Sequence, residues 1–224
     1  SLDGSGASLH RRGYRAAMGA APLKENLAAG LIRLTGWDGS EPLVDPCCGS
    51  GVLLIEAALT ALQQAPGLER RFALEGWADF QPDLWDKEVD RARQRRRGDL
   101  TLPPLLGIET DPTIADQARA NVETAGLSGV IRICTGSFQA EALPDGPGVL
   151  VCNPPYGQRI GDEQELDALY GALGQFVRQE ASGWQLWLLS GNPKLTGALR
   201  LKASRRIPVS NGGIDCRWLQ YEIR

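Results

Sequence analysis

Short apolar runs alternate, along most of the chain, with longer segments in which apolar residues recur at helical spacing. Runs of roughly four to eight apolar residues between turn residues are typical of buried strands, and the longer segments are typical of helices that cover them. The pattern predicts strands at residues 41–46, 104–109, 130–136, 148–153 and 184–191, and helices at residues 50–65, 111–127 and 163–181. Strands that alternate with helices form a mostly parallel sheet with helices on both faces. We therefore expect an α/β fold with a doubly wound sheet.

The helix expected at residues 111–127 has clear boundary signals. Asp111 is a favourable N-cap, Pro112 fits the first helical turn, and Gly126 is typical of a helix end. These residue types suit the backbone groups that a helix leaves unpaired at its ends.

Residues 204–224 depart from the alternation of strands and helices. Two segments of strand character are joined there by Asn211-Gly212-Gly213, and Asn and Gly tolerate the positive φ of a tight hairpin turn. We therefore expect a seven-stranded, mostly parallel sheet that ends in an antiparallel hairpin. The segment 66–103 is long for a connection and carries many charges, so it predicts an excursion on the surface.

Length and composition are those of a single globular domain. The chain has 224 residues, of which 42% are hydrophobic and 23% are charged. No apolar stretch reaches the roughly 18 to 20 residues that span a bilayer, so no membrane partner is expected. We expect one catalytic domain over residues 1–224, with residues 1–40 packing on it as a helical and extended segment.

The cysteines argue against a metal site and for a reducing compartment. The chain has five of them, Cys47, Cys48, Cys134, Cys152 and Cys216. This number is odd, no two cysteines have CxxC spacing, and the single His10 cannot complete a Cys/His cluster. No base or cation stands beside the adjacent pair in the sequence, so no thiolate nucleophile is expected. The sequence therefore predicts no metal and a cytoplasmic location.

Unusual residues gather where the first strands of the expected sheet end, which is where such sheets bind ligands. DPCCGSG at residues 45–51 follows the first strand, and its Gly49 and Gly51 let the backbone approach a ligand at a helix N-terminus. Glu109 ends the second strand, and its carboxylate can accept hydrogen bonds from both hydroxyl groups of a ribose. A short glycine loop is a weak signal alone, and no GKS or GKT follows it, which excludes a Walker loop. Together the two loops predict a nucleoside site.

The sequence NPPYG at residues 153–157 stands where a strand should pass into a helix. Each proline fixes φ near about −65° and removes a donor, so the carbonyl groups point in set directions. The side-chain carbonyl of Asn153 and the backbone carbonyl of Pro154 suit an exocyclic amino group, which has two N–H donors. Tyr156 offers an aromatic face on which an unpaired base can stack. The alternative is a purely structural corner with a core tyrosine.

These three motifs resemble the cofactor loop, the ribose acid and the amino-group motif of class I S-adenosylmethionine-dependent methyltransferases. The resemblance extends through SLHRRGYR at residues 8–15 and NGGIDCRWLQYEI at residues 211–223 to the THUMP-linked RNA methyltransferases. That family includes bacterial enzymes that methylate N2 of guanine in large-subunit ribosomal RNA. The resemblance implies a Rossmann-like class I methyltransferase fold, S-adenosyl-L-methionine as cofactor, and RNA as partner.

The resemblance also implies roles for individual residues. The cofactor is expected to lie against the loops after the first three strands, at Asp45, Pro46, Cys47, Gly49, Ser50, Gly51, Glu109, Thr110, Ser137 and Phe138, and against Asn153. The target base is expected at Asn153, Pro154, Pro155 and Tyr156. Relatives usually have an acidic residue where this chain has Ser137, whose hydroxyl can still accept a hydrogen bond from the adenine amino group, and Phe138 is expected to pack on the adenine.

A net charge of −3 and a pI near 5.3 are low for a protein that binds RNA by itself. In the resembling family an RNA-binding THUMP domain precedes the catalytic domain and supplies much of the affinity. Within this chain, phosphate contacts are expected at Arg11, Arg12 and Arg15. Two alternatives stay open: an adenine-N6 methyltransferase acting on DNA, and a cofactor-binding scaffold in ribosome assembly that does not catalyse.

Overall fold

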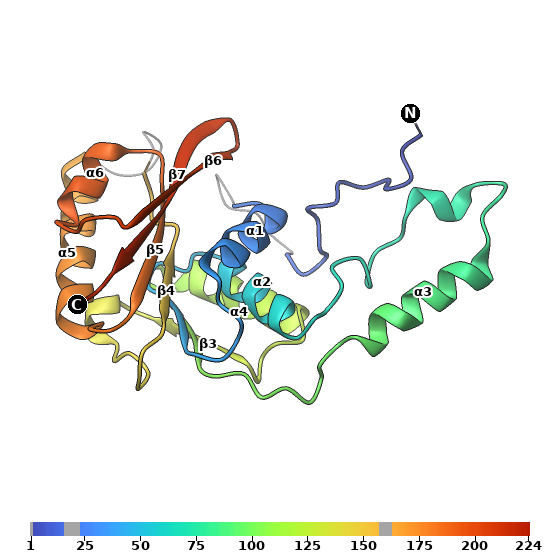
Figure 1. The fold of residues 1–224 in the computed structure, drawn as a ribbon, viewed down its shortest axis with the longest axis horizontal. Coiled ribbons are helices and arrows are strands. Elements are labelled where there is room, and N and C mark those ends of the chain that lie inside the picture. The colour runs from blue at the N-terminus through green and yellow to red at the C-terminus, as the bar shows by residue number, and fades with distance from the viewer. Residues whose placement is uncertain (1, 16–22, 157–162) are drawn as a thin grey trace.

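The computed structural model describes residues 2–15, 23–156 and 163–224, and one seven-stranded sheet runs through them (Figure 1). The strand order is β3-β2-β1-β4-β5-β7-β6. β1 to β5 are parallel, and β7 is antiparallel to both β5 and β6. The strands are β1 (Leu43–Asp45), β2 (Leu105–Glu109), β3 (Ile131–Thr135), β4 (Val149–Cys152), β5 (Gln185–Ser190), β6 (Arg205–Asn211) and β7 (Ile214–Glu222). The expected seven-stranded, mostly parallel sheet is confirmed.

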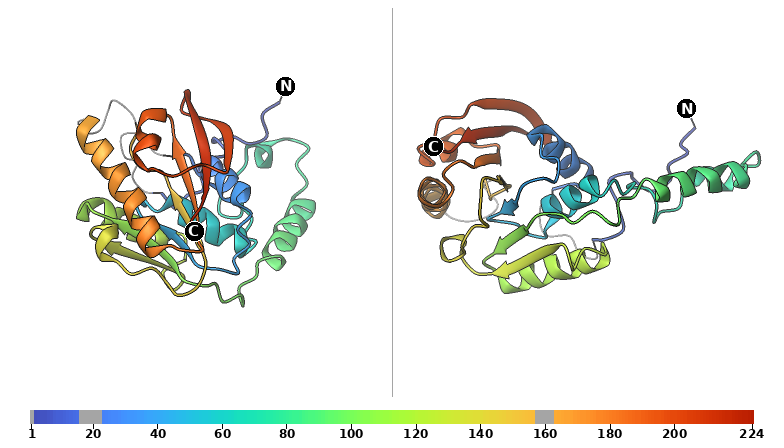
Figure 2. Two further views of the ribbon diagram at one scale, coloured as in Figure 1. Left: turned by 60° about the vertical axis from the view of Figure 1, so that its left-hand side comes forward. Right: turned by 60° about the horizontal axis from the view of Figure 1, so that its bottom comes forward.

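Helices cover both faces of the sheet (Figures 1 and 2). α1, α2 and α4 contribute Leu31, Leu54 and Val122 to one buried apolar cluster, whereas α5 and α6 contribute Leu173 and Leu195 to the other. The helices are α1 (Glu25–Thr35), α2 (Val52–Ala61), α3 (Pro82–Gln94), α4 (Pro112–Thr124), α5 (Glu163–Glu180) and α6 (Pro193–Ala198), with short 3-10 helices η1 (Ala73–Gly76) and η2 (Phe138–Ala140). The doubly wound α/β class is therefore confirmed.

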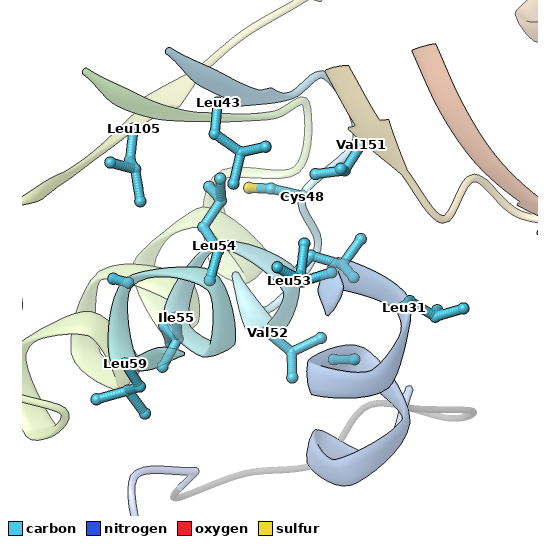
Figure 3. Close-up of a cluster of buried hydrophobic side chains, with 14 of the residues drawn as sticks. Leu31, Leu43, Cys48, Val52, Leu53, Leu54, Ile55, Leu59, Leu105 and Val151 are labelled. Carbon is cyan, nitrogen blue, oxygen red and sulfur yellow. The ribbon is translucent and has the colours of Figure 1, made fainter. Parts of the chain in front are cut away.

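The centre of the fold is a helix that is buried almost all round. In α2, nine of the ten residues are buried, because the helix lies between the sheet and α1. Figure 3 shows Leu43 and Val151 of the strands on one side of α2 and Leu31 of α1 on another. β1 and β4 are buried at every position, as expected for parallel strands with both faces covered. The site described below begins where these elements meet.

Boundary residues place α4 and the hairpin as expected. Asp111 Oδ1 accepts hydrogen bonds from the N–H groups of Thr113 at 2.8 Å and Ile114 at 3.3 Å. The turn between β6 and β7 consists of Gly212 and Gly213, both at positive φ, at +60° and +85°. Positive φ at both central residues is the geometry that matches the twist of a two-residue hairpin.

The segment 66–103 contains no strand, which confirms a surface excursion. It contains α3, which has no buried residue and extends away from the sheet (Figure 1). Phe72 packs edge-on against Trp85 with ring centroids 5.3 Å apart, which gives the excursion a small apolar contact of its own. α3 carries few apolar residues among its charges, so apolar spacing gave no signal for this helix. No helix of the described residues is long and apolar enough to cross a membrane.

Candidate functional site

The winding of the sheet reverses between β1 and its neighbour β4. From β1 the chain adds β2 and then β3 on one side, and it adds β4 and then β5 on the other. Loops that leave adjacent strands in opposite directions open a crevice at the carboxyl ends of those strands. The loops after β1, β2, β3 and β4 all reach this edge, so most of the residues predicted for a site come together there.

The glycine loop after β1 is held by hydrogen bonds from both sides and leaves open space beside Gly49. Cys48 donates its N–H to the carbonyl of Ile108 at 2.9 Å, and Asn121 donates its side-chain N–H to the carbonyl of Ser50 at 3.0 Å. Gly49 has φ +52°, and a Cβ placed on it would meet no atom within 4 Å. The loop thus presents open space directly before the N-terminus of α2, where unpaired N–H groups favour anionic or polar ligand atoms.

Cys48 of this loop is not set up as a nucleophile. The Cys48 side chain points into the apolar core between the sheet and α2 (Figure 3), and the residue is 5% exposed. Burial raises the pKa of the Cys48 thiol well above its usual range, and the carboxylates of Asp45 and Glu109 raise it further. A thiol in this environment stays protonated and packs as a small apolar group.

Asp45 ends β1 with a carboxyl group that is 1% exposed. Its Oδ1 accepts the N–H of Cys47 at 3.1 Å. Burial raises the pKa of Asp45 to about 8, and the nearby charge of Glu109 acts in the same direction. The carboxyl group is therefore mostly protonated at neutral pH, and a cation that bound beside it would favour its ionised form.

Glu109 ends β2 and ties that strand to the glycine loop. Its Oε2 accepts the N–H of Gly49 and its Oε1 accepts the N–H of Asp111, both at 3.0 Å. The hydroxyl of Thr110, which is exposed, lies 3.4 Å from Oε1. An ionised carboxylate has about four lone-pair sites, so Glu109 can still accept hydroxyl donors from a ligand.

The loop after β3 differs in part from the expectation. Ser137 Oγ accepts the N–H of Gln139 at 3.2 Å and so caps η2. Phe138 was expected to pack on the adenine, but it is 4% exposed and its ring meets the ring of Phe176 of α5 at 5.3 Å. Its aromatic face is therefore used in the core, where burial of a large ring is most stabilising. Phe138 thus supports the loop from the core, and its contact with the adenine stays a prediction.

The corner after β4 holds an acceptor that has no donor. Asn153 Oδ1 is buried and makes no hydrogen bond to any described residue, and Pro154 beside it is buried as well. A buried polar atom without a partner costs about 1–3 kcal/mol, so a ligand that donates a hydrogen bond to Asn153 Oδ1 would recover that free energy. Pro155 is half-buried, and Gly157, which closes the motif, lies outside the described residues.

Tyr156 is held by the C-terminal hairpin, which sequence reasoning did not connect with the motif. The side-chain N–H of Asn211 donates to the Tyr156 hydroxyl oxygen at 2.7 Å, and Cys216 Sγ lies 3.6 Å from the same oxygen. The ring lies next to Gly191, where an added Cβ would be 3.3 Å from Tyr156 Cδ2. Burial raises the pKa of Tyr156 to about 12, so the phenol is neutral. The only sequence signal for Asn211 was its place in the hairpin turn.

Two of the three arginines expected to contact phosphate face the protein instead. Arg12 Nε lies 3.5 Å from Glu56 Oε1, and Arg15 Nε lies 3.9 Å from Glu25 Oε1. Burial raises the pKa of Glu56, and Arg12 partly offsets this. Guanidinium groups beside buried carboxylates are not free for a polyanion. Arg11 is exposed, so the expectation of a phosphate contact narrows to that residue.

Among residues 2–15, 23–156 and 163–224, no group of three or more His, Cys, Asp or Glu side chains is arranged to hold a metal ion. The site therefore consists of two carboxyl groups, a glycine loop, and the Asn153 corner beside an anchored Tyr156. Cationic and hydroxyl-rich ligands suit the carboxyl groups, and an amino group suits the unpaired carbonyl.

Comparisons with known proteins agree with this chemistry. The RMKL-like methyltransferase domain family matches residues 12–220. A protein of Synechocystis sp., provisionally named an RNA methyltransferase, is 43% identical over 224 residues, which are all of this chain and 58% of that protein. The ribosomal RNA large subunit methyltransferase K/L of Marinomonas sp. is 43% identical over 235 aligned residues, covering all of this chain and 32% of that protein.

A solved structure has the same fold. The crystal structure of SMU.472, provisionally named a methyltransferase and complexed with SAH, superposes with a TM-score of 0.93 at 32% identity, covering 99% of this chain and 58% of that one. The chain thus spans little more than half, or about a third, of the length of the relatives that it matches.

Proposed function

Because the chain belongs to the RMKL-like methyltransferase domain family, we propose that it transfers a methyl group from S-adenosyl-L-methionine to the exocyclic amine of an RNA base. The target that we propose is N2 of guanine in large-subunit ribosomal RNA. The name of the Marinomonas relative and the SAH bound to SMU.472 support the substrate and the cofactor. The unpartnered Oδ1 of Asn153 is the observation that carries the proposal.

The residues at the crevice fit the proposed cofactor. S-adenosyl-L-methionine supplies an electrophilic methyl group on a sulfonium, together with an amino acid moiety and a ribose. Asp45 offers a carboxyl group to the cationic moiety, and the open backbone at Gly49 offers space beside it. Glu109 has lone pairs left for the ribose hydroxyls after accepting two backbone N–H groups. The remaining loop residues, Pro46, Cys47, Ser50 and Gly51, and Thr110 shape the wall of this site.

The proposed chemistry needs acceptors for the target amine. The amino nitrogen of guanine is conjugated with its ring and is a poor nucleophile. When Asn153 Oδ1 and the Pro154 carbonyl accept its two N–H groups, the nitrogen lone pair is directed away from the ring plane. The new N–C bond then forms as the S–C bond breaks, and the nitrogen loses one proton to solvent. Positioning and fixed dipoles would provide the catalysis, without a covalent intermediate.

Tyr156 provides the stacking face for the target base in this proposal. Its hydroxyl is anchored by Asn211, so its ring is held beside the Asn153 corner. Stacking of a base on an aromatic ring is worth about 1–3 kcal/mol, which offsets part of the cost of taking a base out of its stack.

We further propose that residues 1–224 form a single catalytic domain and that a THUMP domain elsewhere in the full-length protein supplies RNA affinity. The net charge of −3 supports this division, because a chain of this charge attracts a polyanion weakly. The five free cysteines support a reducing, cytoplasmic location.

Methyl transfer to defined nucleic acids tests the proposal. The chain is incubated with methyl-labelled cofactor and with deproteinised large-subunit ribosomal RNA or double-stranded DNA, and the nucleosides are separated. We expect label in N2-methylguanosine. Asn153→Ala should lower the turnover number by about 10²- to 10³-fold, because a preorganised polar group is lost. Asn26→Ala, on the exposed face of α1, is the matched control and should keep full activity.

Other outcomes decide between the alternatives. Label in N6-methyladenine of DNA would replace the RNA proposal by a DNA methyltransferase. Cofactor binding in a calorimeter with no transfer to either polymer would favour a scaffold. Full activity of Asn153→Ala would remove the catalytic role of the corner.

A further inference from the structure

A cavity lies on the α5 and α6 side of the sheet, beyond the end of β5, and none of the predicted site residues lines it. We call it the hairpin groove; its polar lining is Ser190, Asn192, Thr196, Arg206, Asp215 and Arg217. Its volume is about 440 Å³. Small-molecule sites commonly measure about 300–1,000 Å³, so the groove is large enough for a nucleotide.

The groove begins at the same edge of the sheet as the catalytic corner. Its lining includes Gly191, which directly follows β5 and is close to Tyr156 Cδ2. β4 and β5 are adjacent and parallel, with Cys152 opposite Leu188, so their carboxyl ends lie side by side. A strand of nucleic acid with one base at Tyr156 would have to pass the end of β5 at Gly191 for its neighbouring nucleotides to enter the groove.

Strand alternation puts two arginines into this groove. Opposite residues in an antiparallel pair share one face of the sheet. Arg206 lies opposite Leu219, and Pro208 lies opposite Arg217, so these residues are on the face that α5 and α6 cover. Asn211 lies opposite Ile214 on the other face. One hairpin thus anchors Tyr156 from one face and lines the groove from the other.

Both guanidinium groups have most of their donors free. Arg206 donates one N–H to the carbonyl of Ala203 at 3.3 Å, and Arg217 donates one to the carbonyl of Cys216 at 3.0 Å. Neither has a carboxylate oxygen within 4.0 Å among the described residues. A guanidinium group has five N–H donors, in a geometry that matches phosphate oxygens.

We propose that the hairpin groove binds the phosphate backbone of the RNA next to the target base, through Arg206 and Arg217. The inference rests on the proposed function, because it requires an RNA strand at Tyr156. Asp215 also lines the groove and lowers its positive charge. Its carboxylate can accept a hydrogen bond from a ribose 2′-hydroxyl, which DNA lacks. The groove therefore selects a strand that has phosphates and 2′-hydroxyls together.

RNA binding by charge variants tests the groove. Filter binding of labelled, deproteinised large-subunit ribosomal RNA is measured between 50 and 200 mM salt, about the range in which phosphate contacts weaken strongly. Arg206→Ala and Arg217→Ala should each weaken binding about five- to tenfold at the lowest salt and reduce the salt slope by about 0.7 to 1. Arg217→Lys should keep the slope, since it keeps the charge.

Arg205→Ala is the matched control, because Arg205 is the chain neighbour of Arg206 but lies opposite Gln220 on the other face. It should bind RNA as the unchanged chain does. The groove proposal is overturned if Arg205→Ala and Arg206→Ala weaken RNA binding equally. It is also overturned if the unchanged chain binds no RNA at about 50 mM salt, the lowest concentration of the series.

The two proposals can fail separately. If Asn153→Ala abolishes methyl transfer while both groove variants bind and react normally, the function stands and the groove fails. If the groove variants lose RNA affinity but the unchanged chain methylates no RNA, the groove stands and the proposed reaction fails.

Discussion

The two carboxyl groups of the cofactor crevice respond differently to their surroundings. Glu109 is half-buried and accepts backbone N–H groups at both oxygens, which ties it to the glycine loop and to the start of α4. Asp45 is buried and receives one N–H, from Cys47, so desolvation prevails and raises its pKa to about 8. Of the two acids at adjacent strand ends, Glu109 is thus held by backbone hydrogen bonds, whereas a cation that bound beside Asp45 would favour its ionised form.

The burial of Asp45 makes the stability of the ligand-free protein depend on pH. An acid whose pKa is raised by folding stabilises the protein fully below its unfolded pKa, and this stabilisation is lost as the pH rises through the folded value. Between about pH 5 and 8 the free energy of unfolding should fall by about 1.4 kcal/mol per pH unit because of this group. Asp45→Asn should remove that slope, as measured by urea unfolding without cofactor.

Asp38→Asn is the control for this experiment. Asp38 is exposed, and hydrogen bonds from Ser40 lower its pKa, so this carboxyl group titrates at acidic pH. The substitution Asp38→Asn should therefore leave the slope between about pH 5 and 8 unchanged. A slope in Asp45→Asn as steep as that of the unchanged chain would contradict the assignment.

The contact between Asn211 and Tyr156 is the second feature at this scale. The donor is on the hairpin and the acceptor is in the motif at residues 153–156, 55 residues apart in the chain. We infer that Asn211 is a positioning residue, which acts through the orientation of the tyrosine ring.

A double-mutant cycle measures this coupling. Tyr156→Phe and Asn211→Ala should each lower kcat/KM about tenfold, because each breaks a buried hydrogen bond worth about 1–3 kcal/mol. The double variant should be no worse than the poorer single variant, because both changes remove the same bond. Ser210→Ala, the chain neighbour on the opposite face, should have no effect. Additive losses in the double variant would show that Asn211 acts independently of Tyr156.

At the scale of elements, α5 is fitted closely to the segment that follows α6. A Cβ added to Gly174 would lie 2.2 Å from the carbonyl oxygen of Leu199, which is backbone and cannot yield as a flexible side chain does. Arg178, one turn further along α5, donates to the same oxygen at 2.6 Å. The glycine therefore allows α5 to approach α6 and fixes the wall next to the hairpin groove.

Two glycines of α5 should respond in opposite ways to the same substitution. Gly174→Ala should destabilise the protein by about 1–3 kcal/mol through overpacking. Gly171→Ala should stabilise it by about 0.5–1 kcal/mol, because a Cβ there meets nothing within 4 Å and alanine favours the helix. The midpoints of thermal unfolding compare the variants. A lower midpoint for Gly171→Ala, or an unchanged one for Gly174→Ala, would disagree with the packing described.

At the scale of the whole molecule, the sheet gathers the proposed chemistry at one edge. The cofactor loops lie on β1, β2 and β3, the amine-binding corner lies on β4, and the hairpin groove begins beside β5. The order of the loops across the sheet therefore repeats the order of the reaction partners, from cofactor to target base to flanking strand. α3 stands apart from this edge and has no buried residue (Figure 1).

The sequence by itself determined the strands, the helix bounds set by Asp111 and Gly126, and the hairpin at Gly212 and Gly213. These features follow from local physics, because apolar spacing, capping side chains and tolerance of positive φ act between residues close in the chain. The order of the loops at the strand ends was accessible for the same reason, since parallel strands present their carboxyl ends at one edge.

Only the tertiary structure decided which side chains remain available at that edge. Phe138 and Arg12 have residue types suited to a ligand. In the fold, however, Phe138 packs against Phe176, and Arg12 lies beside the carboxylate of Glu56. Conversely, the hydrogen bond from Asn211 to Tyr156 joins segments that are far apart in the sequence. The physical reason is that burial, desolvation and long-range hydrogen bonds are set by packing across the whole chain, and no short window of sequence contains them.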